Sequence, residues 1–222
     1  MRLPEDELAA LKSASLLRHI PDADSSLKNF SSNDYLGLSQ HPEIKQAYQE
    51  AIEEYGAGST ASRLICGTME PHRNLEKTIA TAKGTEAALT FSTGYATSVG
   101  AITSLLGKGD VVILDKLCHA SLIDGARMSG ATLRVFPHNH LEKLESLLQS
   151  STKKADVNSR ILVITESIFS MDGDAAPLEE ISRLTKQYNC LLMVDEAHAL
   201  GLIGPTGMGL AEELGIQDQI DF

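Results

Sequence analysis

Apolar and polar positions alternate in two different rhythms along most of the chain. Short apolar runs predict five strands, at 87–91, 111–114, 133–136, 161–165 and 191–194. Segments with apolar residues at helical spacing predict four helices in the same region, at 75–82, 95–106, 141–148 and 178–188. Repeated strand–helix order, with strands that are apolar on both faces, predicts an α/β fold with a mainly parallel sheet sandwiched by helices.

The first part of the chain has a different texture. It opens with Glu5, Asp6 and Glu7 and has no long apolar stretch, so we expect an amphipathic surface helix there and not a signal peptide. A further helix is predicted at 41–55, ended by Gly56. We therefore expect an N-terminal segment at 1–40 and one large domain at 41–222.

Composition narrows the possible partners. The formal charge of -11 repels phosphate backbones and anionic lipid, so we expect neither nucleic acid nor membrane as a partner. The longest aliphatic runs are too short to span a bilayer. Cys66, Cys118 and Cys190 lie far apart and form no C-x-x-C pair, which indicates no disulfide framework, no metal site and a reducing cytoplasm.

Polar residues follow two of the predicted strands directly. Asp195 and His198 come after the strand at 191–194, and Glu166 and Ser170 come after the strand at 161–165. Ligands of parallel sheets bind at the carboxyl ends of the strands, so these residues are candidates for a site. The letters Asp195-Glu-Ala-His also occur in helicases, but the G-x-x-x-x-G-K-[ST] loop of those enzymes is absent from the sequence.

Two further segments are candidates for the same edge. Gly94 and Tyr95 lie where a predicted strand meets a predicted helix, and a helix N-terminus with a glycine favours a phosphate. His119 follows the strand at 111–114. Each histidine also has a purely structural explanation as a hydrogen-bonded core or surface residue, and His138-Asn-His140 is interpreted as a polar loop.

Together, five motifs in order resemble the α-oxoamine synthase family of fold-type I pyridoxal-phosphate enzymes. The motifs lie at 29–38, 94–95, 119–121, 169–174 and 194–198, and the resemblance runs from about Asn29 to the chain end. It implies an aspartate aminotransferase-like large domain that binds pyridoxal 5'-phosphate. It also implies a cytoplasmic homodimer that condenses an amino acid with an acyl-CoA, releasing carbon dioxide and leaving an α-aminoketone.

The resemblance also implies roles for individual residues. Asp195 would pair with the pyridine nitrogen of the cofactor, His119 would stack on its ring and His198 would bind its phenolic oxygen. Ser170, with Glu166 nearby, would position the cofactor, and Gly94 and Tyr95 would meet its phosphate. The residues expected near the substrate are Asn33 and, for a carboxylate, Arg18 or Arg63.

The substrates and the completeness of the domain stay open. The segment at 29–34 favours L-alanine with a pimeloyl-type thioester, as in biotin synthesis, whereas 63–68 resembles enzymes that join glycine to acetyl-CoA. In this family the lysine that holds the cofactor follows the motif at Asp195 by a few tens of residues, but the last lysine here is Lys186. The sequence is therefore expected to be an inactive fragment of an acyltransferase, incomplete at its C-terminus; the alternative is a non-catalytic relative or partner subunit.

Overall fold

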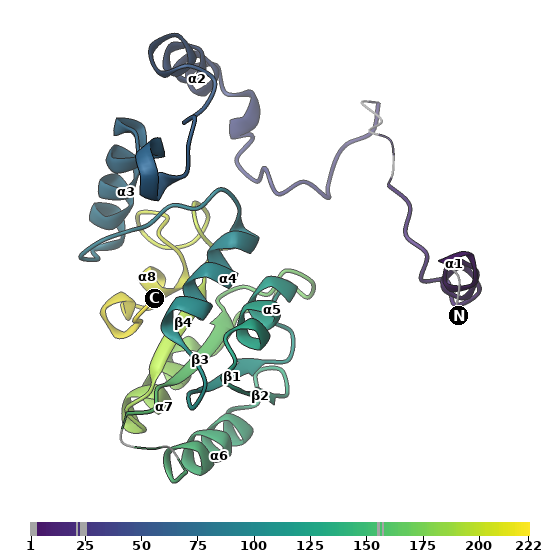
Figure 1. Ribbon diagram of the computed structural model, residues 1–222, viewed down its shortest axis with the longest axis vertical. Helices are drawn as coiled ribbons and strands as arrows, with labels where there is room; N and C mark the ends of the chain where they lie inside the picture. Colours follow the sequence, from purple (N-terminus) through teal and green to yellow (C-terminus); the bar gives the residue numbers. More distant parts are fainter. Residues whose placement is uncertain (1–3, 21, 23–25, 155, 157) are drawn as a thin grey trace. The chain divides into compact units, whose positions relative to one another are not determined.

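The computed structural model describes residues 4–20, 22, 26–154, 156 and 158–222. The chain divides into two compact units, Met1–His41 and Pro42–Phe222, which are described separately. In the first unit, α1 (Pro4–Ser13) confirms the helix predicted near the N-terminus, and a short 3-10 helix follows at Leu38–Gln40 (Figure 1). No described side chain of α1 is buried.

The second unit begins with three helices and alternates strands and helices from β1 onward. Its helices are α2 (Pro42–Tyr55), α3 (Glu70–Lys83), α4 (Gly94–Leu105), α5 (Ala120–Met128), α6 (Leu141–Thr152), α7 (Leu178–Gln187) and α8 (Leu210–Glu213). Its strands are β1 (Val111–Asp115), β2 (Thr132–Phe136), β3 (Ile161–Glu166) and β4 (Leu191–Asp195). Short π-helical and 3-10 turns lie at Arg63–Gly67 and Gln217–Gln219.

All four strands form one parallel sheet in the order β2-β1-β3-β4. The last residues of β3 and β4, Glu166 and Asp195, are direct neighbours in the register, and Asp115 ends β1. Parallel pairing brings the carboxyl ends of these strands to one edge. The predicted parallel sheet is therefore confirmed, and so is the expectation that the acidic residues end its strands.

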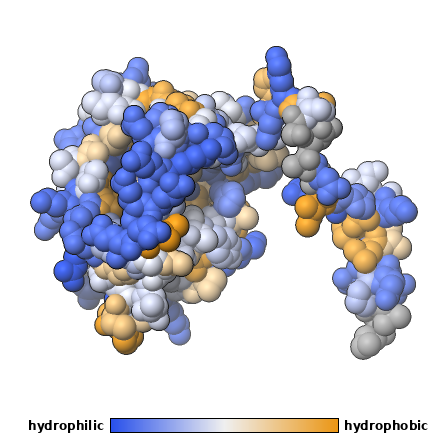
Figure 2. Space-filling view, turned by 90° about the horizontal axis from the view of Figure 1, so that it is seen from above, coloured by the Kyte–Doolittle hydropathy of each residue, from blue (hydrophilic) through white to orange (hydrophobic). Residues whose placement is uncertain are grey.

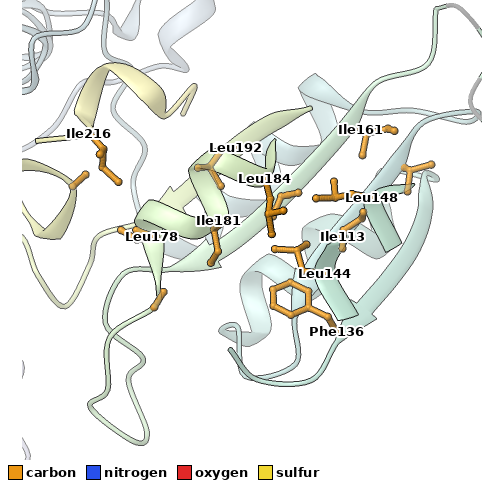
Figure 3. Close-up of a cluster of buried hydrophobic side chains, with 14 of the residues drawn as sticks. Ile113, Phe136, Leu144, Leu148, Ile161, Leu178, Ile181, Leu184, Leu192 and Ile216 are labelled. Carbon is orange, nitrogen blue, oxygen red and sulfur yellow. The ribbon is translucent and has the colours of Figure 1, made fainter. Parts of the chain in front are cut away.

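Helices cover both faces of the sheet, as Figure 1 shows. Along β1, Val111 and Ile113 face one core cluster with α6 and α7, whereas Val112 and Leu114 face another with α4 and α5. Figure 3 shows the first cluster around Ile113. Burial on both faces is the reason why β1 and β3 are apolar along most of their length, and it confirms the predicted sandwich.

The predicted strand at 87–91 is wrong. These residues make no β-ladder with any other described residue, and Leu89 is 66% exposed. The N–H of Thr90 donates instead to the carboxylate of Glu76 on α3, at 2.8 Å. The apolar run favours extended backbone, but a β-strand also needs hydrogen bonds to a neighbouring strand. Here the side chain of Glu76, and not a strand, accepts the N–H of Thr90.

The apolar pattern predicted neither the short helix α8 nor helix α5. Helix α5 bears on the site. It packs closely on α4, and Gly125 lies at the contact: a methyl group there would be 3.0 Å from the backbone oxygen of Ser98. His119 caps α5 through its side chain, which accepts a hydrogen bond from the N–H of Ser121 at 3.2 Å. The α4–α5 contact therefore sets the position of a predicted site residue.

The surface is mostly polar. The face shown in Figure 2 is largely hydrophilic, with separate patches of hydrophobic residues. Among the described residues, no helix is both long and apolar enough to cross a membrane.

Candidate active site

A pocket of about 450 Å³ lies at the carboxyl edge of the sheet. It is bounded by the ends of β3 and β4 and by the N-terminal turns of α4 and α5. Six of the predicted site residues line it: Gly94, Tyr95, His119, Glu166, Asp195 and His198. They come from four separate segments of the chain, which the sheet brings to one place. No lysine is among the described residues that line this pocket.

The start of α4 offers an anion-binding surface. Thr93 caps the helix by accepting a hydrogen bond from the N–H of Ala96 at 3.0 Å. The N–H groups of Gly94 and Tyr95 lie in the first turn of the helix, where no earlier helical carbonyl can accept their hydrogen bonds. They form part of the positive end of the helix dipole. A methyl group on Gly94 would meet no atom within 4 Å, so there is open space above the helix start. A phosphate fits such a place.

His119 is held from one side. Its Nδ1 lies 2.8 Å from Oγ of Ser121, and that hydroxyl donates to Oγ of Ser98 on α4 at 3.0 Å. The side chain as a whole is exposed. The N–H of Ser121, which donates to Nδ1 at 3.2 Å, therefore holds the ring while the residue borders the pocket.

Glu166 is a nearly buried carboxylate, 2% exposed, in the wall of the pocket. It accepts hydrogen bonds from the backbone N–H groups of His119 and Ser170. Burial raises the pKa of Glu166, the charge of Asp195 raises it further, and the backbone hydrogen bonds act against both. Glu166 therefore binds the backbone of two other site residues and connects them.

The motif at the end of β4 has two anchoring contacts. Oδ1 of Asp195 accepts the N–H of Ala197 at 2.9 Å. The carboxylate of Glu196 accepts the N–H groups of Leu210 and Ala211 at 3.1 and 3.0 Å, which ties the start of α8 to the end of β4. Sequence reasoning missed the role of Glu196 because its partners lie 14 and 15 residues further along the chain.

Four predicted residues are not among those that line the pocket. Ser170 is exposed on a turn after β3, although its N–H binds Glu166. Arg63 lines a separate pocket of about 700 Å³, where its guanidinium binds both carboxylate oxygens of Glu76. Arg18 and Asn33 are exposed residues of the first unit. Their roles stay predictions.

One polar cluster near the site was not predicted. His138, Asp172 and Asp174 have potential metal-ligand atoms within 4.8 Å of one another. Both ring nitrogens of His138 are, however, paired with carboxylates, of Asp115 and Asp174, so the cluster is an ion-pair network in this structure. The sequence analysis interpreted this segment only as a polar loop.

Comparisons with known proteins agree on one family. Residues 26–219 match the family model described as aminotransferase class I and II. An 8-amino-7-oxononanoate synthase of Citrifermentans bemidjiense is 50% identical over 86% of this chain and 48% of its own length. The chain thus spans about half the length of these curated relatives.

Solved structures give the same picture. Serine palmitoyltransferase of Sphingomonas wittichii is 37% identical, with a TM-score of 0.81 over 86% of this chain and 47% of that one. Serine palmitoyltransferase from S. paucimobilis is 33% identical, with a TM-score of 0.86 over 97% of this chain and 58% of that one. The latter structure is described as containing a bound PLP-myriocin aldimine.

Proposed function

Because this chain belongs to the aminotransferase class I and II family, we propose that it forms the pyridoxal 5'-phosphate-binding part of an α-oxoamine synthase. The observation that carries the proposal is the convergence of six predicted residues on one pocket at the carboxyl edge of a parallel sheet. The proposal includes the cofactor, because the chain offers a suitable group for each end of it. These groups are considered in turn.

The phosphate end of the cofactor would meet the N–H groups of Gly94 and Tyr95, above which there is open space. Asp195 would hold a proton on the pyridine nitrogen, because a carboxylate beside a basic nitrogen favours its charged form. His119, fixed through Nδ1, would orient the ring, and His198 would bind its phenolic oxygen. The bound cofactor would supply an electron sink for negative charge on the α-carbon of the amino acid.

The proposed reaction is the condensation of L-alanine with a pimeloyl-type thioester, with loss of carbon dioxide, as in biotin synthesis. Curated relatives named 8-amino-7-oxononanoate synthase support this choice over glycine with acetyl-CoA. Asn33, Arg18 and Arg63 are proposed to face the substrate. The guanidinium of Arg63 would then bind the substrate in addition to Glu76 and Thr90, to which it already donates hydrogen bonds.

We also propose that the intact protein is a homodimer. The surface of the second unit exposes several large apolar side chains, among them Leu64 at 93% and Ile65 at 78%. Apolar groups so exposed are common at interfaces between subunits. Sedimentation of the intact gene product gives the oligomeric state directly.

The experiment that tests the cofactor proposal compares the wild type with Asp195→Asn. An amide cannot hold the pyridine nitrogen protonated, whereas the contacts at Gly94 survive the change. We expect bound pyridoxal phosphate to lose the protonated signature in its pyridine ¹⁵N chemical shift, with little loss of affinity. In the intact gene product, turnover of L-alanine with pimeloyl-CoA is expected to fall by roughly 100-fold or more.

Asp218→Asn is the matched control, because it removes a carboxylate beside the amino ends of β3 and β4, away from the pocket. It should retain the wild-type chemical shift. An unchanged shift in Asp195→Asn would reject the role of Asp195. A wild type that binds no pyridoxal phosphate, and an intact gene product without turnover, would favour the non-catalytic relative.

A further inference from the structure

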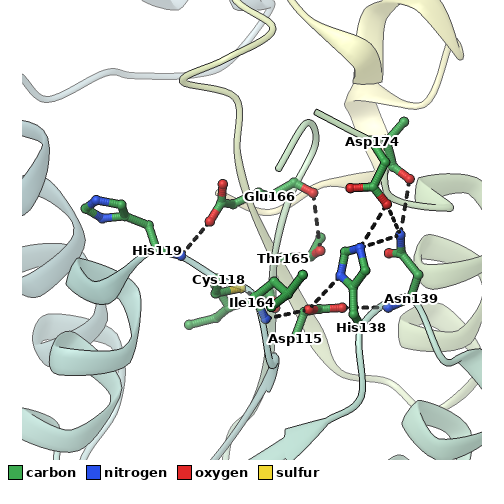
Figure 4. A network of polar contacts seen from close by, with 11 residues as sticks. Asp115, Cys118, His119, His138, Asn139, Ile164, Thr165, Glu166 and Asp174 are labelled. Atoms are coloured by element: carbon green, nitrogen blue, oxygen red, sulfur yellow. Dashed lines mark hydrogen bonds and ion pairs between the residues drawn. The ribbon is translucent and has the colours of Figure 1, made fainter. Parts of the chain in front are cut away.

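The polar network around His138 joins the ends of three strands (Figure 4). Asp115, the fully buried last residue of β1, accepts the N–H groups of Leu117 and Asn139, each at 2.8 Å. Its Oδ1 also lies 3.0 Å from Nδ1 of His138, which follows β2. On the other side of the ring, Nε2 lies 2.8 Å from Oδ2 of Asp174, in the turn after β3.

This geometry favours the charged form of His138, because Nε2 lies closer to the carboxylate of Asp174, at 2.8 Å, than to the amide Nδ2 of Asn139, at 3.2 Å, which would donate to a neutral ring. Ionised carboxylates only accept hydrogen bonds, and a neutral imidazole has a single N–H. Only the imidazolium can therefore donate to Asp115 and Asp174 at once. Burial lowers the pKa of His138, but the hydrogen bonds with Asp174 and Asp115 outweigh this and raise the pKa above its usual value. The remaining ionisable group in the cluster, Asp172, is also acidic.

The turn that His138 holds is a closed loop of six residues, Phe169–Asp174. The N–H of Phe169 donates to the carbonyl of Asp174 at 3.0 Å, and the N–H of Gly173 donates to the carbonyl of Phe169 at 2.8 Å. The ring of Phe169 is buried and meets the imidazole of His138 edge-on, with centroids 4.4 Å apart. His138 thus contacts both ends of the turn, through Phe169 and through Asp174.

The turn leads directly to the pocket. Ser170 is its second residue. The N–H of Ala176, just after the turn, donates at 2.9 Å to the carbonyl of Ser167, which directly follows Glu166 and its carboxylate. The same carboxylate accepts the N–H of His119, which caps α5 (Figure 4). A displacement of the turn would therefore act on Glu166 and, through it, on His119.

We propose that protonated His138 is a positioning residue, which clamps the Phe169–Asp174 turn between Asp115 and Asp174 and thereby holds Ser170, Glu166 and His119 in place for the cofactor. The last step rests on the proposed function, but the clamp itself does not. His138 does not line the pocket, so it acts through other residues. Loss of the proton removes one of its two donated hydrogen bonds and loosens the turn.

The clamp is tested without cofactor by hydrogen exchange of the Phe169 and Gly173 amides in Asp174→Ala. Asp174 is partly exposed, so this variant is expected to fold. Loss of a charge-assisted hydrogen bond should speed exchange in the turn by about tenfold or more. Asp172→Ala is the matched control, because it removes the same charge from the same turn without breaking the bond to His138. Equal exchange in both variants would overturn the clamp.

The pH dependence separates positioning from simple packing. After correction for intrinsic exchange rates, protection of the turn in the wild type should fall as pH rises through the raised pKa of His138. His138→Gln should lack this dependence. His140→Asn should retain it, because asparagine can still cap α6 in place of His140. A wild-type profile that matches His138→Gln would contradict a protonated clamp.

Coupling to the site is measured by titration with pyridoxal phosphate. Asp174→Ala should bind it about tenfold more weakly than Asp172→Ala, since displacement of the turn disturbs Glu166 and His119. Equal affinities, together with faster exchange, would overturn the link from the turn to the site. If the wild type does not bind pyridoxal phosphate, the proposed function fails, and the exchange comparison still decides the clamp.

Discussion

The contact between α4 and α5 can be tested by a single methyl group at Gly125. In Gly125→Ala the new Cβ would lie 2.9 Å from Cδ1 of Ile102, 3.0 Å from the backbone oxygen of Ser98 and 3.2 Å from Cα of Val99. Ile102 is fully buried, and the other two atoms belong to the α4 backbone, so none of them can move aside at little cost. Helix α5 itself must shift.

The magnitude follows from two opposing effects. Alanine gains about 1 kcal/mol of helix propensity over glycine. Overpacking of a tight contact costs about 1–3 kcal/mol. We therefore expect a net loss of up to about 2 kcal/mol in the free energy of unfolding, which lowers the Tm of a protein of this size by up to about 8 °C.

Gly100→Ala is the control on the opposite side of α4. Its Cβ would approach only the Phe91 ring, at 2.8 Å, and this ring is 40% exposed and can rotate away. The control should therefore be neutral or more stable than the wild type, by up to about 1 kcal/mol. Thermal and urea unfolding measure both variants. A Gly125→Ala variant as stable as Gly100→Ala would refute the packing argument.

Two further predictions concern other groups. The Arg63 guanidinium and the N–H of Thr90 lower the pKa of Glu76 to about 2. This pairing therefore stabilises the fold at pH values above about 4.5, the pKa of the carboxyl group in the unfolded chain, and the stabilisation is lost as pH falls towards 2. Glu76→Gln should therefore have a lower Tm than the wild type at pH 7, and a deficit that is just as large at pH 3 would contradict the pairing. Because no described lysine lines the pocket, borohydride reduction with pyridoxal phosphate should label the lysines of this chain sparsely, and one stoichiometrically labelled lysine would show otherwise.

The sheet was predictable because burial on both faces leaves a direct trace in the sequence. Strands β1 and β3 are buried at every position, and their apolar runs mark them almost to the residue. The residues at 87–91 form a similar apolar run, but β-pairing also depends on a neighbouring strand, which the local sequence does not encode. The sequence did not predict helix α5 because Gly125 and the polar residues among its nine positions weaken the helical spacing of apolar residues.

The candidate site was predictable where its residues lie in motifs, and not where they act at a distance. Gly94, His119 and Asp195 each follow a recognisable local pattern. His138 has its partners 23 and 36 residues away, at Asp115 and Asp174. Such pairs become visible only when the sheet has brought the strand ends together, so an isolated histidine in a polar loop gave no signal.

Three of the four strands end in an acidic residue, and the surroundings of each carboxylate decide what it can do. Asp115 on β1 is fully buried and receives two backbone N–H groups and the imidazolium of His138. Glu166 on β3 is occupied by the N–H groups of His119 and Ser170. Asp195 on β4 accepts the N–H of Ala197, and it borders the pocket.

A carboxylate that is not neutralised by the protein favours a positive charge from elsewhere. Of the three strand ends, Glu166 and Asp195 line the pocket, and Asp115 does not. Asp115 and Glu166 are committed to holding the backbone around it. Two of the carboxylates at this edge of the sheet therefore hold the surrounding backbone, and the third, Asp195, is the one that we propose to meet the protonated nitrogen of the cofactor.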